Sequence, residues 1–223
     1  MQSATAVALA IAIATPAFAG LTDPFVPGWR GEAGTTYGQW EAFTQPFGCP
    51  NECDVAGSTF FGALYAMNPF GYSGIDGNIY ADPGIVMPIL VEGQLPGQFV
   101  QSVVVNISTE LSGIDLGSVL LTLYDEDGMK EMYTFTSTEV LFDGPESATR
   151  VIKFDGLSSG LPIGFVAKRV SVSFSNDLAA TAAAGGFGLD AVSIDIQSVP
   201  APGSFALIVL AGLTGGAGRR RRR

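Results

Sequence analysis

The chain has 223 residues, with 21 acidic and 11 basic side chains, no histidine and a formal net charge of −10. Without histidine, a Ser-His-Asp or Cys-His mechanism is excluded and the commonest zinc ligand is missing. The acidic excess repels phosphate backbones, so we do not expect the chain to bind nucleic acid.

The first 19 residues have the pattern of a secretory signal peptide. Ala6 to Ala14 is apolar, and Ala17-Phe18-Ala19 is the small-x-small pattern that signal peptidase reads before Gly20. We therefore expect the mature chain to begin at Gly20. No lysine or arginine precedes the apolar run, and an amphipathic helix of the folded domain is the alternative interpretation.

The segment from Gly20 to Gly97 holds both tryptophans and most of the prolines. Its candidate strands are short: Gln39 to Phe43, Ser58 to Ala66 and Ile85 to Val91. We expect strand-and-loop cover for a larger sheet structure. A separate small domain is the alternative, although no charged or low-complexity linker divides this segment from the rest.

Cys49 and Cys53 are the only cysteines, in Cys49-Pro50-Asn51-Glu52-Cys53. In an exported protein, a pair this close predicts a disulfide across a small loop. Free thiols and a metal or redox pair are the alternatives.

Aromatic residues are concentrated in the same Gly-rich half of the chain, and they predict a flat platform for sugar rings. The main candidates are Trp29, Trp40 and Tyr37, followed by Tyr65, Phe70, Tyr72 and Tyr80. The alternative is that these rings fill the core or cover a sheet edge.

The second half of the chain predicts β structure. Phe99 to Ser108 is apolar on both faces, which is typical of a central strand, and further strands are expected at Val119 to Tyr124, Glu131 to Thr136, Arg150 to Phe154, Lys168 to Phe174 and Leu189 to Ile196. Ala179 to Gly186 is expected to form a flexible loop or a short helix. We predict an all-β fold, a single β-sandwich or jelly-roll-like domain over residues 20–198.

Asp125-Glu126-Asp127-Gly128 lies between two of these strands and resembles the opening of a calcium loop. The terminal glutamate of such a loop is missing, because Thr136 stands in its place. We expect a hairpin turn there, with Asp125 and Asp127 as a weak calcium candidate. Calcium binding through scattered carboxylates, such as Asp54, Asp76, Asp82 or Asp190, remains the other possibility, and no further cofactor is expected.

The last 25 residues join three features: Val199-Pro200-Ala201-Pro202, an uncharged segment from Gly203 to Gly218, and five arginines, Arg219, Arg220, Arg221, Arg222 and Arg223. The order resembles the PEP-CTERM sorting tag of bacterial proteins, with Ala201 at the usual glutamate position. The resemblance implies cleavage near the Pro-x-Pro by an exosortase, a transient stay in the inner membrane and delivery to the cell surface or matrix. A permanent single-span anchor with the arginines as a stop-transfer cluster is the alternative.

Without the two terminal segments, the chain has 6 basic and 21 acidic residues and a net charge of −15. No catalytic motif is visible. We therefore expect a non-enzymatic, exported surface or matrix protein with a structural or adhesive role, processed by signal peptidase and an exosortase-like enzyme. A carbohydrate-binding module that uses the aromatic platform is the alternative, and a polysaccharide hydrolase with a carboxylate pair is a further one.

Overall fold

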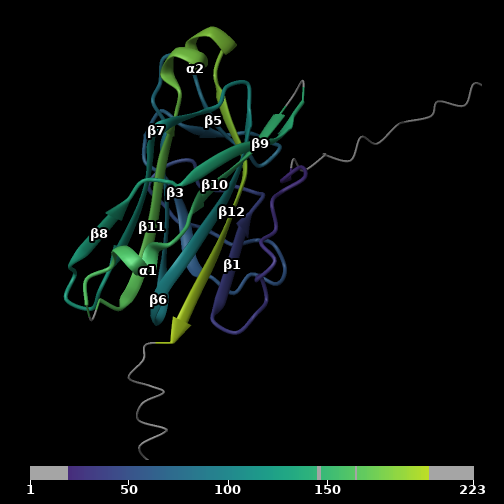
Figure 1. The fold of residues 1–223 in the computed structure, drawn as a ribbon. Helices are drawn as coiled ribbons and strands as arrows, with labels where there is room; N and C mark the ends of the chain where they lie inside the picture. Colours follow the sequence, from purple (N-terminus) through teal and green to yellow (C-terminus); the bar gives the residue numbers. More distant parts are fainter. Residues whose placement is uncertain (1–19, 145–146, 164, 201–223) are drawn as a thin grey trace, which may run out of the picture.

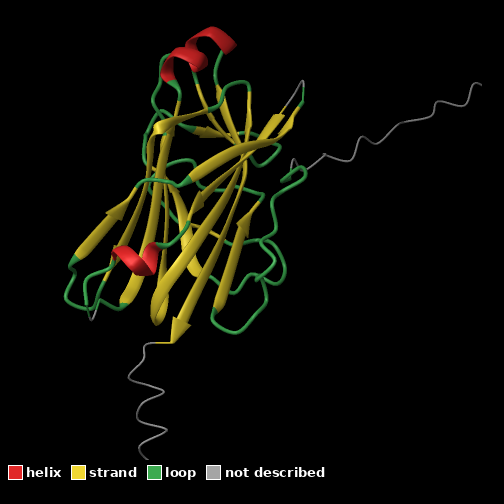
Figure 2. Cartoon of the chain, viewed as in Figure 1, coloured by secondary structure: helices red, strands yellow, loops and turns green. Residues whose placement is uncertain are grey.

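The structure is a computed structural model that describes residues 20–144, 147–163 and 165–200. The predicted signal peptide lies outside these residues, as does the tag from Ala201 onward. Within them the chain is a β-sandwich of antiparallel strands, with a short helix at each end (Figures 1 and 2). No helix in the described part is long and apolar enough to cross a membrane.

One layer, here called sheet 1, contains six strands. Across the sheet they are β2 (Asn51–Glu52), β3 (Phe61–Ala66), the first half of β6 (Pro88–Glu110), β11 (Ala167–Asn176), β7 (Ile114–Tyr124) and β8 (Lys130–Tyr133). The side chains of alternate residues, among them Leu64, Val91 and Val172, point inward and are buried in the core. The opposite residues of each strand form the outer face of this sheet.

The second layer, sheet 2, is built on the other half of β6. Its strands are β9 (Ser137–Asp143), β10 (Ser147–Phe154), β6, β12 (Phe187–Pro200) and, both on the far side of β12, β1 (Thr35–Trp40) and β5 (Ile79–Ala81), with β4 (Tyr72–Ser73) outside β5. Val105, Ile152 and Ile194 lie side by side on its inner face. The two layers bury these apolar rows against each other.

Strand β6 belongs to both sheets and passes between them near Pro96-Gly97, where Gly97 has a φ of 80°. The prediction of a central strand over Phe99 to Ser108 is confirmed, but it is continuous with the strand expected at Ile85 to Val91. The strands of the first half pair with β6 and β12, so residues 20–97 belong to the same sandwich.

Several other expectations are confirmed with shifted bounds. The hairpin of β7 and β8 turns through Gly128 at a φ of 80°, although β8 ends at Tyr133. The stretch expected as a loop or short helix forms α2 (Leu178–Ala184), which Asp177 caps by accepting hydrogen bonds from two backbone amides. A second short helix, α1 (Leu157–Gly160), precedes β11. Strand β9, with an irregular exposure pattern, was not predicted.

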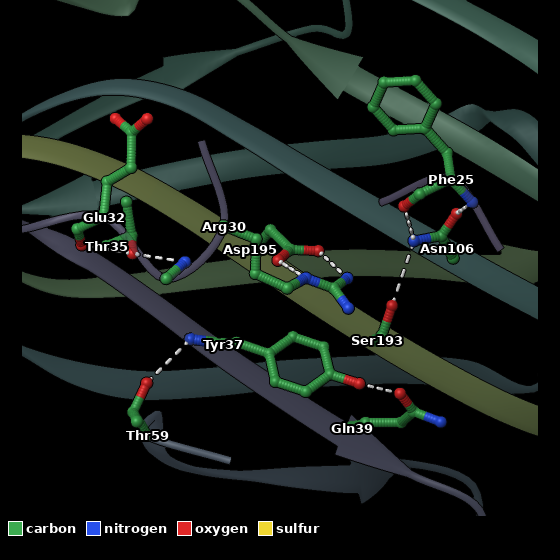
Figure 3. Close-up of polar contacts among 11 residues, drawn as sticks. Phe25, Arg30, Glu32, Thr35, Tyr37, Gln39, Thr59, Asn106, Ser193 and Asp195 are labelled. Atoms are coloured by element: carbon green, nitrogen blue, oxygen red, sulfur yellow. Dashed lines mark hydrogen bonds and ion pairs between the residues drawn. The ribbon is translucent and has the colours of Figure 1, made fainter. Parts of the chain in front are cut away.

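The N-terminal segment, residues 20–34, lies against the outer face of sheet 2, where Phe25 contacts β6 and Arg30 contacts β12 (Figure 3). Asn106 on β6 holds this segment by its backbone, because its side chain accepts from the Phe25 amide at 2.9 Å and donates to the Phe25 carbonyl at 3.1 Å. The Lys153 ammonium lies 3.6 Å from the centre of the Phe25 ring. Polar residues of this outer face, Asn106 and Ser193 among them, are therefore buried.

Arg30 of the same segment forms a two-pronged ion pair with Asp195 of β12 (Figure 3). Its Nε and Nη2 donate to the two carboxylate oxygens at 2.5 and 2.6 Å, and its guanidinium lies 4.0 Å from the centre of the Tyr37 ring. Burial raises the pKa of Asp195, and the hydrogen bonds and charge of Arg30 oppose that rise. The pair fixes the N-terminal segment to sheet 2.

Candidate functional site

The outer face of sheet 1, here called the open face, carries exposed side chains, among them Phe61, Gln94 and Met132. One row of its residues runs across five neighbouring strands: Phe61, Gln94, Arg169, Tyr124 and Lys130. At about 4.8 Å between strands, this row is roughly 19 Å long. Its side chains combine exposed apolar, amide and cationic groups on one flat surface.

Phe61 stands at one end of this row, and its side chain is 84% exposed. Four residues further along the same strand, half-buried Tyr65 adds a second ring to the open face. Exposure of an aromatic ring to water is unfavourable, and covering the ring with an apolar surface lowers the free energy.

The other end of the row is polar. The Arg169 guanidinium lies 4.0 Å from the centre of the Tyr124 ring and 3.4 Å from the Glu92 carboxylate of the adjoining strand. These contacts hold the guanidinium flat on the sheet. Arg169 therefore presents fixed N–H donors beside exposed Gln94, an arrangement that can bind hydroxyl or carboxylate oxygens.

Two hollows adjoin the open face. One, of about 530 Å³, is lined by residues of β2 and β3 and by the loops beside them, including Glu52, Phe61 and Tyr65. The second, of about 440 Å³, is lined by Gln94, Tyr124 and Arg169, together with Lys168 and the β7–β8 turn. An extended ligand that crosses the row would enter both hollows.

The structure does not assemble the predicted aromatic platform, and this prediction is wrong. Trp40 is 0% exposed, and its indole N–H donates to the carbonyl of Asn51 at 2.8 Å inside the sandwich. Tyr37, three residues earlier on the same strand, points to the opposite face and lies under Arg30. Trp29 is half-buried in the N-terminal segment. The three rings cannot form one surface.

The signal that could have found the open face was the alternation in Phe61-Gly62-Ala63-Leu64-Tyr65-Ala66. The odd-numbered positions carry the two outward-facing rings, exposed Phe61 and half-buried Tyr65. The even-numbered Leu64 and Ala66 are in the core. Tyr65 was among the predicted aromatics, whereas Phe61, Arg169 and Tyr124 were missed. Arg169 and Tyr124 come together only because β11 pairs with β7.

Cys49 and Cys53 are not bonded to each other in the structure, which corrects the predicted disulfide. Cys49 is exposed, whereas the Cys53 sulfur packs beside Gly38 of β1 and the carbonyl of Phe60, at 3.9 Å from its oxygen. Burial raises the pKa of the Cys53 thiol, which keeps it in the unreactive protonated form.

Asp125 is used by the hairpin turn itself. Its Oδ1 accepts from the backbone amides of Asp127 at 3.0 Å and Met129 at 2.8 Å. Within the described ranges, no three carboxylate, thiolate or imidazole side chains are gathered as a metal centre. The turn therefore has a structural account without an ion.

Neither a protein-family model nor a curated protein sequence matches the chain. Among solved structures it is similar to a variant of a family 29 carbohydrate-binding module complexed with mannohexaose, at 12% identity over 74% of this chain and 89% of that one, with a TM-score of 0.27. A second is TmCBM61 complexed with β-1,4-galactotriose, at 16% identity, 59% and 80% coverage and a TM-score of 0.27. A third is a family 28 carbohydrate-binding module specific for non-crystalline cellulose, at 10% identity, 66% and 79% coverage and a TM-score of 0.33. At these scores, the likenesses carry no conclusion about ligand or activity.

Proposed function

We propose that the body of this protein is a non-catalytic glycan-binding module that acts outside the cytoplasm, with a polysaccharide chain lying across the open face. The observation that carries the proposal is the row from Phe61 to Lys130, which joins an exposed ring to fixed polar donors on the uncovered side of the sandwich. Apolar stacking surface with a few placed polar groups is the chemistry that sugar rings require.

The same face gives the adhesive role a physical basis. A surface or matrix protein that holds polysaccharide needs a long, accessible binding surface and no reaction.

Replacing Phe61 by alanine is expected to weaken polysaccharide binding by at least tenfold. The substitution removes the most exposed ring of the open face without removing a core contact, and truncation of an aromatic anchor of a binding surface costs about 2 kcal/mol or more, above the roughly 1.4 kcal/mol that corresponds to tenfold. The purified protein would be screened on a glycan array, and the affinity for the best ligand measured by calorimetry for wild type and variant.

Phe70→Ala is the matched control, because this ring is 70% exposed but belongs to the loop that follows β3 rather than to the open face. We expect it to bind as the wild type does. Silence across the array, or equal losses in both variants, would contradict a binding site at Phe61.

Export and sorting complete the proposal, with cleavage after Ala19 and near Val199 to Pro202. The carboxylate of Glu41 supports the first site, because a methyl group placed on Gly20 would lie 3.2 Å from its oxygen. A new ammonium group at Gly20 would therefore arise beside a carboxylate. Val199 and Pro200 pair with Phe99 and Gln98 as the last residues of β12, so cleavage there would follow directly on the folded body.

The intact mass of the protein from its native host is expected to match a chain that begins at Gly20 and ends between Val199 and Pro202. Cell-membrane, surface and medium fractions would be measured separately, with the species expected at the surface or in the medium. A species that keeps Arg219 to Arg223 and stays in the inner membrane would mean a permanent anchor.

A further inference from the structure

The open face has a second row of residues, two positions along each strand from the row that begins at Phe61. From β3 to β8 this second row consists of Ala63, Glu92, Ser171, Thr122 and Met132. Ser171 and Thr122 are 5% and 7% exposed, so small side chains lie low between the first row and a third row that contains Tyr65. Neighbouring rows are about 7 Å apart. A polysaccharide laid along the first row therefore passes beside Glu92.

Glu92 is the only acidic residue of these three rows, because the third row, Tyr65, Leu90, Ser173 and Leu120, is uncharged. Its carboxylate lies 3.4 Å from Nη1 of Arg169, which stands on the middle strand of the five. The side chains of Arg169 and Glu92 are 38% and 31% exposed, so both can contact a ligand. The centre of the face therefore offers donors and an acceptor whose charges cancel.

The hollow beside the β7–β8 turn has the same balance. Its lining includes the two cations of Lys168 and Arg169 and the two carboxylates of Asp125 and Glu126. Lys168 lies 4.0 Å from the Glu126 carboxylate. Exposed Asp127 of the same turn adds a further negative charge. The polar end of the open face therefore has no excess of positive charge that would attract a polyanion.

Neutral and acidic sugars would meet Arg169 and Glu92 differently. The hydroxyl groups of a neutral sugar can accept from the Arg169 guanidinium and the Gln94 amide and can donate to the Glu92 carboxylate, so they fit the pair as it stands. The carboxylate of an acidic sugar could bind Arg169 only beside Glu92. Two like charges would then be neighbours at a binding surface, which is unfavourable.

On the basis of the proposed glycan-binding function, we infer that the open face selects neutral polysaccharides over acidic ones and that Glu92 determines this selectivity. Its carboxylate neutralises the guanidinium that would otherwise attract an anion, and it repels an anion that approaches. Water reaches both side chains and screens their charges, so the expected selectivity is about tenfold.

The test measures the affinity of the whole protein for soluble polysaccharides by retardation in native gels. The probes are β-1,4-glucan, galactomannan and β-1,4-galactan, each in a hydroxyethylated and a carboxymethylated form, so that the two substituents are similar in size and differ in charge. At low salt, we expect the neutral form of a bound polysaccharide to bind about tenfold more tightly than its acidic form. At about 1 M salt, where the screening length is roughly 3 Å, the ratio should approach one.

Glu92→Gln keeps the shape of the side chain and removes its charge, and it should lower the ratio of neutral to acidic affinity by about tenfold at low salt. Glu139→Gln is the matched control, because it makes the same change of net charge at an exposed position of β9 in sheet 2. Its ratio should equal that of the wild type, and thermal melts would verify that both variants fold.

Three outcomes would overturn the selectivity while leaving glycan binding in place. They are an acidic form that the wild type binds as tightly as the neutral form, a ratio that Glu92→Gln leaves unchanged, and a ratio that Glu139→Gln lowers equally. Binding to none of the six probes would instead contradict the proposed function itself, and the selectivity with it.

Discussion

Replacing Arg30 by alanine is expected to lower the free energy of unfolding by about 3–5 kcal/mol, since it leaves a buried charge without its partner. The side chain of Asp195 is 0% exposed, and both of its oxygens accept from Arg30. The variant also loses the guanidinium above the Tyr37 ring. Urea denaturation at pH 7.5 would measure the loss.

The pH dependence of this variant distinguishes a charge effect from lost packing. Without Arg30 the pKa of Asp195 rises further above its value in the unfolded chain, so the folded state then binds the proton more tightly. Its stability should therefore recover as the pH falls from 7.5 toward 4. Arg30→Ala combined with Asp195→Asn should also recover part of the loss, and Lys130→Ala, at an exposed position, should cost under about 0.5 kcal/mol. A deficit that is the same at both pH values would argue against the buried charge as its cause.

Replacing Trp40 by alanine is expected to cost about 3–5 kcal/mol and to leave polysaccharide affinity unchanged in the fraction that folds. The indole packs edge-on against Phe60, with ring centres 6.1 Å apart, and joins β1 of sheet 2 to the start of β3. Its loss leaves a cavity and also removes the hydrogen bond that the indole donates to the Asn51 carbonyl.

Thermal unfolding and calorimetric glycan titration of the same Trp40→Ala sample would separate the two roles. Phe61→Ala gives the opposite expectation, a stable protein with weakened binding, because that ring is exposed. A Trp40→Ala variant with a wild-type melting temperature and lost glycan binding would restore Trp40 to the binding surface and contradict its assignment to the core.

Much of the fold could be predicted because strand alternation is a local property. Val170, Val172 and Phe174 are two residues apart and all face the core, as their spacing indicates. The β-bulge at Asp190 could not be predicted, because it depends on how β12 pairs with β6. Leu189 and Val192 both face the core although they are three positions apart. The β9 strand could not be predicted either, because its residues are mostly exposed and therefore show no alternation of buried and exposed positions.

The candidate site was predictable in chemistry but not in place. The aromatic residues of the first half suggested a binding platform. The choice of Trp29, Trp40 and Tyr37 was wrong, because the size and polarity of a ring do not tell which face of a strand it occupies. Phe61 and Arg169 are 108 positions apart in the chain and become neighbours of Gln94 only through the pairing of β3, β6 and β11.

By itself, the sequence determined the class of the fold and excluded histidine-based catalysis. It also predicted export and sorting from the motifs at both ends. Composition, periodicity and terminal motifs can all be read from residues close together in the chain. Only the tertiary structure decided which sheet face is open. That choice depends on the N-terminal segment, whose Arg30 and Phe25 reach Asp195 and Asn106, far along the chain, and cover sheet 2. Long-range pairs of this kind leave no local pattern, since each partner alone is an ordinary polar or aromatic residue.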